Sequence, residues 1–530
     1  MTMASRILVA DPIAEEGLSL LRQHGEVVVR PHKSPEELRA LIGEYDALVV
    51  RSETRVTADL IAAGQRLQVI GRAGVGVDNI DVEAATDRGI VVVNAPEGNT
   101  ISAAEHTIAL MLALARHVPQ ANAALQAGRW QREPYLGVEL RGKVLGIVGL
   151  GRVGSEVARR ARSFEMRLLA HDPYISTDHF RILGVEPVSL DKLLEEADFV
   201  TVCTSLTSTA RGLIGPSELG RMKPTARLIN ASRGGVIDEA ALYDALRDGR
   251  IAGAALDVFQ AEPLSPESPL LGLPNLITTP HLGGSTVEAQ TSVAVDVAEQ
   301  IVAVLDGRPA RYAVNAPFVS PEDYALVAPF LTVAGYIGRL AQQLVNGQPE
   351  RLEVHYEGDI AARDTKPLRA AVLGGLYAGS TEERVTWVNV DLVAAKRGLR
   401  VTEQRTSEHE TYGSLITATL TTSAGVASVG GTWMRGEPHI VRLDDWWLDV
   451  VPTPGTYWML VRHHDRPGMI GTVGTLLGNA DINISFMEVS REHPRGNAFM
   501  VLGLDDPVPE DQRALIRNIP DVASVRVVAL

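Results

Sequence analysis

Short apolar runs alternate with amphipathic helical segments over roughly the first hundred residues of the chain. The runs have the length of strands, and the segments between them carry apolar residues at helical spacing. Strands that alternate with helices predict a parallel sheet covered on both faces. The expected strands are Ile7–Val9, Val27–Val29, Leu48–Val50, Leu67–Ile70 and Ile90–Val93, and the expected helices are Ala14–Arg22, Pro35–Gly43, Ala58–Ala63 and Val82–Gly89.

A second series of the same kind occupies the middle of the chain. The expected strands are Val144–Val148, Leu168–Ala170, Asp198–Thr204, Ala226–Asn230, Ala254–Phe259 and Leu276–His281, with helices at Ser155–Ser163 and Glu239–Asp248. Long apolar helices over Ala103–Arg116 and Ser285–Leu305 flank this series, and the second returns the chain to the first sheet. We therefore expect one doubly wound domain over residues 99–284, inserted into a flavodoxin-like domain made of residues 1–98 and 285–316.

The pattern changes after Asn315-Ala316-Pro317. A long helix over Ala325–Asn346 opens an α+β domain expected over residues 317–455. Its other expected elements are strands Leu352–Tyr356, Thr386–Val390 and Ser414–Thr421 and helices Leu368–Tyr377 and Val390–Lys396. Residues 456–530 then read strand, helix, strand, strand, helix, strand, an order typical of a ferredoxin-like sandwich.

Composition narrows the class of protein. A chain of 530 residues is too long for one core. A formal charge of −15 disfavours nucleic acid or an anionic membrane as a partner. The sequence holds no uninterrupted apolar run near 18 residues and no signal-peptide core, so a cytoplasmic protein is expected. The single cysteine, Cys203, excludes an intramolecular disulfide, and no metal site is expected.

A glycine motif joins the first strand of the second series to its helix. Gly149-x-Gly151-x-x-Gly154 supplies a tight turn, a backbone open to a pyrophosphate and a close helix–strand contact. Asp172 follows the next strand, where such folds place the carboxylate that binds the adenosine ribose hydroxyls. The order of strand, glycine loop, helix, strand and acidic residue predicts a dinucleotide site. Because that carboxylate would repel a 2′-phosphate, the site is expected to favour NAD over NADP.

Charged side chains follow several of the expected strands. Arg51 and Arg72 end two strands of the first sheet, and the alternatives for them are solvated surface arginines or a cradle for an anionic substrate. Arg233, Glu262 and His281 end three strands of the second. A histidine can accept a hydroxyl proton, a carboxylate can fix its tautomer, and a guanidinium can bind a substrate carboxylate. Together the three predict an alcohol dehydrogenation site, although each alone also fits a structural role. His106, within the apolar helix, fits a core or interface histidine better than a catalyst.

Several motifs resemble the D-isomer-specific 2-hydroxyacid dehydrogenases. They are His106–Leu110, Gly146–Gly154, Arg233–Glu239 and Pro280-His281. Within that family, Arg51-Ser52, Gly71-Arg72-Ala73-Gly74 and Asp78-Asn79 are similar to the branch that oxidises D-3-phosphoglycerate to 3-phosphohydroxypyruvate with NAD, the first step of L-serine biosynthesis. One departure is local: the family often has His and Pro where this chain has Cys203 and Ser205.

The resemblance implies a role for each residue of the site. Arg233, Glu262 and His281 would be the catalytic trio. The substrate would be held by Arg51, Ser52, Arg72, Gly74, Asn99, Arg233 and His281. NAD would be held by Val75, Gly149, Gly151, Arg152, Val153, Gly154, Asp172, Thr204, Ala231, Ser232, Arg233, Asp257, His281, Gly283 and Gly284.

The C-terminal half resembles regulatory domains. Residues 317–455 resemble the intervening domain of long family members, and the acidic, aromatic segment Leu443–Asp449 favours a packing or interface role over an anion site. Residues 456–530 resemble an ACT domain, whose site for L-serine would include Asp465, Gly468 and Asn483 at a subunit interface of a homotetramer. For the ACT-like domain, the alternative is a plain structural domain. For the whole protein, the alternatives are a reductase for glyoxylate or hydroxypyruvate, or an NAD-sensing corepressor on the same fold.

Overall fold

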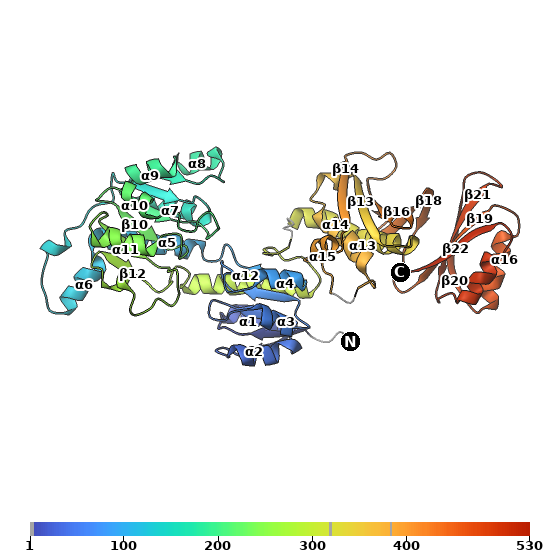
Figure 1. Cartoon of the computed structure of the whole chain (residues 1–530), viewed down its shortest axis with the longest axis horizontal. Coiled ribbons are helices and arrows are strands. Elements are labelled where there is room, and N and C mark those ends of the chain that lie inside the picture. Colours follow the sequence, from blue (N-terminus) through green and yellow to red (C-terminus); the bar gives the residue numbers. More distant parts are fainter. Residues whose placement is uncertain (1–4, 317–320, 382–383) are drawn as a thin grey trace.

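The computed structural model describes residues 5–316, 321–381 and 384–530. The described residues form four sheets of five, seven, six and four strands. Figure 1 shows an elongated molecule, with the seven-stranded domain at one end, the four-stranded domain at the other and helix α12 (Val287–Leu305) between them. The predicted start of the third domain, at residue 317, lies outside the described residues.

The first sheet is parallel, with strand order β2-β1-β3-β4-β5, as in flavodoxin-like folds. Its strands are β1 (Ser5–Val9), β2 (Gly25–Val29), β3 (Ala47–Val50), β4 (Val69–Arg72) and β5 (Val91–Asn94). Helices α1 (Glu15–Arg22) and α12 pack on one face; α2 (Pro35–Leu41), α3 (Ala58–Ala63) and α4 (Val82–Asp87) cover the other. Because α12 buries Val297 and Ile301 in the core of this sheet, the predicted insertion of one domain into another is confirmed.

The second sheet is also parallel, in the order β12-β11-β10-β9-β6-β7-β8. Its strands are β6 (Val144–Val148), β7 (Arg167–His171), β8 (Glu186–Pro187), β9 (Phe199–Val202), β10 (Arg227–Asn230), β11 (Gly253–Leu256) and β12 (Leu276–Thr278). Its helices are α5 (Thr100–Arg116), α6 (Val118–Gln126), α7 (Arg152–Arg162), α8 (Thr177–Leu183), α9 (Leu190–Glu196), α10 (Pro216–Arg221) and α11 (Glu239–Arg247). The strand order reverses between β6 and β9, and ligands bind such sheets in the crevice outside the carboxyl ends at that point.

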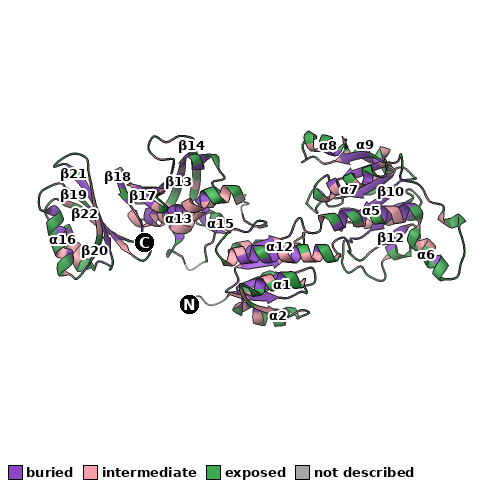
Figure 2. Ribbon diagram, turned by 180° about the vertical axis from the view of Figure 1, so that it is seen from behind, coloured by how far each residue is buried: buried purple, intermediate pink, exposed green. Residues whose placement is uncertain are grey.

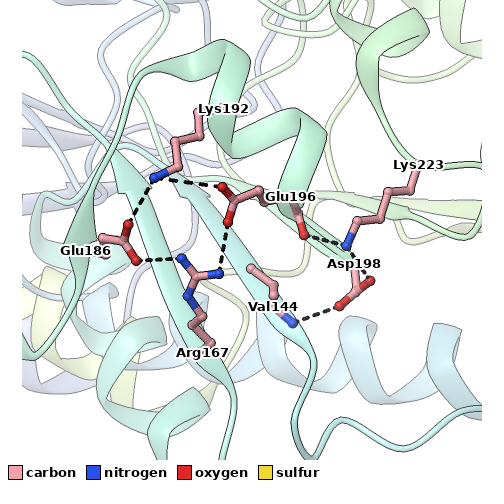
Figure 3. Close-up of polar contacts among 7 residues, drawn as sticks. All are labelled: Val144, Arg167, Glu186, Lys192, Glu196, Asp198 and Lys223. Carbon is pink, nitrogen blue, oxygen red and sulfur yellow. Dashed lines mark hydrogen bonds and ion pairs between the residues drawn. The ribbon is translucent and has the colours of Figure 1, made fainter.

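The amino ends of these strands are fixed by a polar network, away from that crevice (Figure 3). Asp198, just before β9, accepts the N–H of Val144 at 2.9 Å and contacts Lys223 Nζ at 3.0 Å. Burial raises the pKa of Asp198, but these two partners outweigh it and hold the pKa below its usual range. Arg167 pairs nearby with Glu186 at 2.7 Å and Glu196 at 2.9 Å.

The third domain packs α13 (Pro321–Leu344) and α14 (Lys366–Tyr377) against a sheet of order β14-β13-β15-β16-β17-β18. The strands are β13 (Pro349–Gly358), β14 (Arg400–Thr406), β15 (Ser414–Thr422), β16 (Gly425–Met434), β17 (Glu437–Leu443) and β18 (Trp446–Val450). The predicted strand Thr386–Val390 is wrong. Its residues form a turn before α15 (Val390–Lys396), because Asn389 Oδ1 accepts the N–H of Thr386 at 2.8 Å.

Among the described residues, α13 is the one helix that is long and apolar enough by composition to cross a bilayer. Val333, Ile337 and Leu340 on this helix are fully buried in the core of the third domain. One face of this helix is therefore packed in the core of a folded domain (Figure 2).

The fourth domain has the predicted ferredoxin-like order. Its elements are β19 (Tyr457–His464), α16 (Met469–Asn479), β20 (Ile484–Arg491), β21 (Asn497–Leu504), α17 (Glu510–Arg517) and β22 (Val522–Ala529), with sheet order β20-β21-β19-β22. The helices cover one face of the sheet. The other face packs into the core of the third domain through Trp458, Leu460 and Phe499, so these two domains share one apolar core.

Candidate active site

The glycine loop between β6 and α7 has the three properties that the motif predicts. Gly149 has a φ of 94°, a region that favours glycine. A Cβ on Gly154 would overlap the carbonyl oxygen of Gly149, so only glycine permits this helix–strand contact. A Cβ on Gly151 would meet nothing within 4 Å, which leaves the backbone before α7 accessible. The loop therefore fits a dinucleotide pyrophosphate, with Arg152 and Val153 in the first turn of the helix.

Asp172 lies directly after β7 and connects the two halves of the predicted nucleotide site. Its Oδ2 accepts the N–H of Leu150, within the glycine loop, at 2.8 Å, and its Oδ1 accepts the N–H of Tyr174 at 3.0 Å. These contacts hold the carboxylate beside the glycine loop, where a ribose is expected.

His281 and Glu262 form a hydrogen-bonded pair at the carboxyl end of the same sheet. His281 Nδ1 lies 2.7 Å from Glu262 Oε2, and Glu262 Oε1 accepts the N–H of Phe259 at 2.9 Å. Burial raises the pKa of Glu262, but the bonds from His281 and Phe259 outweigh it and hold the pKa below its usual range. A glutamate ionised at neutral pH directs the Nδ1 proton of His281 towards itself, so Nε2 is free to accept a proton.

Asp257 holds the loop that carries His281. Its side chain is fully buried, and its carboxylate accepts the N–H groups of Leu282 at 2.7 Å and Gly283 at 2.8 Å. The hydroxyl of Thr279 donates to Asp257 Oδ1 at 2.6 Å. The resemblance also places Asp257 against NAD, and the structure shows that this carboxylate holds the loop that carries His281.

Three guanidinium groups converge from two domains. Arg51 follows β3, Arg72 ends β4 and Arg233 follows β10, and Arg233 Nε lies 3.4 Å from Asp78 Oδ2 across the domains. Burial and the charges of Arg233 and Arg51 lower the pKa of Arg72 to about 10, so Arg72 is a cation at neutral pH. Arg72 Nε is buried and has no hydrogen-bond partner among the described residues. The cluster therefore fits an anionic ligand.

Two residues that the sequence analysis did not assign to the site position Arg51. Asp11 Oδ2 accepts the N–H of Arg51 at 2.6 Å, and Asn79 Nδ2 donates to the carbonyl oxygens of Arg51 and Thr54 at 2.7 and 2.6 Å. Asp11 follows β1, so its place at a strand end was the signal that could have found it.

The remaining predicted residues lie in loops around the same crevice. Asn99 precedes α5, and a Cβ on Gly284 would lie 3.1 Å from its Nδ2. The N–H of Ser232 donates to Asn230 Oδ1 at 3.0 Å, and Val75 O accepts from Asn94 Nδ2. The other predicted residues are in loops that follow strands: Ser52 after β3, Gly74 after β4, Thr204 after β9, Ala231 after β10 and Gly283 after β12.

The predicted effector residues do not meet within one chain. Asp465 follows β19, whereas Asn483 precedes β20, and these two strands run parallel on either side of β21. The length of β19 separates them, about 20–25 Å at 3.3 Å per residue. Asp465 already contacts Arg491 at 3.1 Å, and Asn483 donates to Asp505 at 2.6 Å. Gly468 has a φ of 91° at the start of α16.

His463 is a further residue of this end of the domain that the sequence analysis did not select. It is 4% exposed, and its Nε2 is buried without a hydrogen-bond partner among the described residues. Its Nδ1 lies 3.0 Å from the carbonyl oxygen of His464, so Nδ1 donates and Nε2 is left as an acceptor.

Similarity to known proteins extends over nearly the whole chain. Residues 108–283 match the model of the D-isomer specific 2-hydroxyacid dehydrogenase NAD binding domain. Residues 326–444 match the D-3-phosphoglycerate dehydrogenase intervening domain, and residues 457–521 match the ACT domain. A D-3-phosphoglycerate dehydrogenase of Synechocystis is 46% identical over 527 residues, which covers 99% of this chain and 94% of the relative. The chain belongs to the D-3-phosphoglycerate dehydrogenase family.

Other similarities agree with this assignment. The D-3-phosphoglycerate dehydrogenase of Archaeoglobus fulgidus is 44% identical, with 95% of each chain covered. The crystal structure of the TT0316 protein of Thermus thermophilus is similar with a TM-score of 0.55 and 38% identity, over 58% of this chain and 99% of that one. A glyoxylate reductase of Paecilomyes thermophila has a TM-score of 0.54 and 31% identity, over 59% and 99%. These two structures cover the catalytic half alone, whereas the sequence relatives extend across both C-terminal domains.

Proposed function

We propose that this chain oxidises D-3-phosphoglycerate to 3-phosphohydroxypyruvate with NAD, the first step of L-serine biosynthesis. The observation that carries the proposal is the convergence of Arg51, Arg72 and Arg233 at the crevice that also holds the His281–Glu262 pair. The substrate has a carboxylate and a phosphate, and three guanidiniums from two domains suit two anionic groups.

Each residue of the proposed catalytic trio has a separate role. His281 Nε2 accepts the proton of the substrate hydroxyl, and the imidazolium that forms is stabilised by the ionised Glu262. Arg233 binds the substrate carboxylate and stabilises charge on the adjacent oxygen. Arg51 and Arg72 complete the anion cradle.

The proposed cofactor site uses the glycine loop and Asp172. The backbone N–H groups before α7 would receive the pyrophosphate, and Asp172 would receive the ribose hydroxyls. NAD, when bound, supplies the two-electron acceptor for the carbon that bears the hydroxyl. The accessible backbone at Gly151 and the fixed carboxylate of Asp172 support this placement.

A reductase acting on glyoxylate or hydroxypyruvate is the second candidate, because the solved structure of a glyoxylate reductase resembles the catalytic half. A steady-state assay separates the two candidates. The hydroxy acids D-3-phosphoglycerate and D-glycerate are assayed with NAD and with NADP. Glyoxylate and hydroxypyruvate are assayed with the reduced forms of both cofactors. We expect the phosphorylated substrate with NAD to have the highest kcat/KM. A higher kcat/KM for glyoxylate with a reduced cofactor would favour the second candidate.

We also propose that the protein acts as a cytoplasmic homotetramer regulated by L-serine. The segment over residues 118–136, which includes α6, exposes large apolar side chains, and this supports self-association. They are Val118, Leu125, Trp130 and Leu136. Because Asp465 and Asn483 lie far apart in one chain, a serine site that uses both requires Asn483 of a second copy. The unpartnered His463 Nε2 is an acceptor near Asp465 and adds a second group that suits the ammonium of the ligand.

We assign the domains as the sequence predicts. Residues 1–98 and 285–316 would bind substrate, residues 99–284 NAD, residues 317–455 would form the intervening domain and residues 456–530 the ACT domain. The separate sheets and the three family matches support these limits.

A further inference from the structure

The main chain at His281 adopts a conformation that needs external support. His281 has a φ of 56°, a left-handed value that is uncommon for a residue with a Cβ. Its N–H donates to the carbonyl oxygen of Asp257 at 2.8 Å, and the next two N–H groups, of Leu282 and Gly283, donate to the Asp257 carboxylate. The orientation of the His281 imidazole therefore depends on Asp257.

A fully buried carboxylate needs several donors to remain ionised. Three donors to Asp257 are neutral: the hydroxyl of Thr279 and the two N–H groups of the loop. His106 supplies the fourth, since its Nε2 lies 3.1 Å from Asp257 Oδ1. Among the described residues, His106 is the one titratable side chain that contacts this carboxylate.

The neighbouring hydroxyl fixes the tautomer of His106. Thr279 Oγ1 gives its only proton to Asp257 and lies 3.2 Å from His106 Nε2. Both neighbours of Nε2 are then acceptors, so Nε2 carries a proton and donates. His106 is on α5, and this bond connects that helix to the loops after β11 and β12.

We propose that His106 is a positioning residue for catalysis, which holds the His281 loop through Asp257 and Thr279. His106–Asp257 is then a second imidazole–carboxylate pair beside His281–Glu262. The two pairs interact, because the charge of Asp257 also acts on Glu262. This proposal rests on the proposed role of His281 as the base.

A packing role for His106 makes a different prediction. Glutamine places an amide N–H near the position of Nε2 and can replace the bond to Asp257. Leucine has a similar volume and no donor. A core histidine that only fills space would tolerate leucine about as well as glutamine, whereas a positioning residue would not.

The test compares His106→Leu, His106→Gln and a control, His24→Leu, in the full-length protein. His24 is an exposed residue next to α1, far along the chain from the site. Hydrogen–deuterium exchange of the peptide over residues 279–286 reports on the loop without substrate. Steady-state kinetics report kcat and KM, and thermal unfolding confirms that each variant is folded.

For His106→Leu we expect kcat to fall about 10–100-fold, the effect of losing one hydrogen bond to a charged group, with KM within about twofold. Hydrogen–deuterium exchange at Leu282 and Gly283 should accelerate in this variant. In His106→Gln, both kcat and the exchange rate should be close to the wild-type values. Equal behaviour of the leucine and glutamine variants in both measurements would overturn the proposal.

Two further outcomes remain distinguishable. If the leucine variant does not fold, His106→Asn takes its place, because its shorter amide cannot reach Asp257. If the wild-type protein does not oxidise D-3-phosphoglycerate but the exchange difference persists, the substrate assignment fails and the positioning role stands.

Discussion

His281 Nδ1 lies 2.7 Å from Glu262 Oε2, and the N–H of Phe259 holds the other oxygen of the same carboxylate. The backbone therefore orients the Glu262 carboxylate independently of its bond to the imidazole. Its lowered pKa keeps it ionised at neutral pH, the state that stabilises an imidazolium. This geometry supports the proposed role of His281 as the general base.

Arg233→Lys should severely reduce turnover. An ammonium carries the same charge but cannot make the planar two-point contact with a carboxylate. We expect kcat/KM for D-3-phosphoglycerate to fall at least about 100-fold. Arg181→Lys is the control, because Arg181 is an exposed residue that pairs with Asp178 on α8. A drop of less than about threefold would contradict the assigned role.

Asp172→Ser should change the preference between cofactors. Loss of the carboxylate removes both the ribose contact and the repulsion of a 2′-phosphate. The ratio of kcat/KM for NAD to that for NADP should decrease, chiefly through a higher KM for NAD. If the unmodified protein already prefers NADP, the assignment of Asp172 is wrong.

Asp198 should stabilise the nucleotide domain in a pH-dependent way. Its pKa is lower in the folded protein, so the stabilisation is complete above the unfolded pKa of about 3.9 and is lost as pH falls through the folded value. Asp198→Asn should lower the unfolding temperature by a constant amount between pH 7 and pH 5, and the difference should shrink below about pH 4. Asp178→Asn, in an exposed ion pair, should change little. A difference that grows on acidification would refute this account.

L-serine should inhibit the intact protein, and Asn483→Ala should abolish that inhibition while kcat is retained. Removal of the whole fourth domain is a poor test, because Trp458, Leu460 and Phe499 belong to the core of the third domain. Calorimetry measures binding to the wild type and the variant; Asn479→Ala, at the exposed end of α16, is the control. No heat of binding to the intact protein would rule out serine as an effector.

Local chemistry at strand ends was predictable from the sequence. The glycine motif, Asp172, Arg233, Glu262 and His281 each follow an apolar run, and parallel strands bring their carboxyl ends to one edge. The bonds between Asp257 and the His281 loop were not predictable, because its partners Thr279, Leu282 and Gly283 depend on the path of that loop.

The third domain was harder to predict because long-range pairing defines its strands. β14 is polar along most of its length, and β16 contains Gly430 and Gly431 at an irregular point of its register. The predicted strand at Thr386 became a turn because the buried Asn389 side chain bonds to the local backbone. Asp465 and Asn483 are close in sequence, but the parallel arrangement of β19 and β20 separates them.

The most direct test of the central claim is the rate of NADH formation from D-3-phosphoglycerate by the wild-type protein and by His281→Asn. Asparagine retains a polar group but cannot accept the proton. We predict that the wild type turns over with NAD and that the variant loses about 10²–10⁴-fold in kcat while it still binds NAD. Near-wild-type turnover in the variant, or no oxidation of D-3-phosphoglycerate by the wild type, would contradict the account.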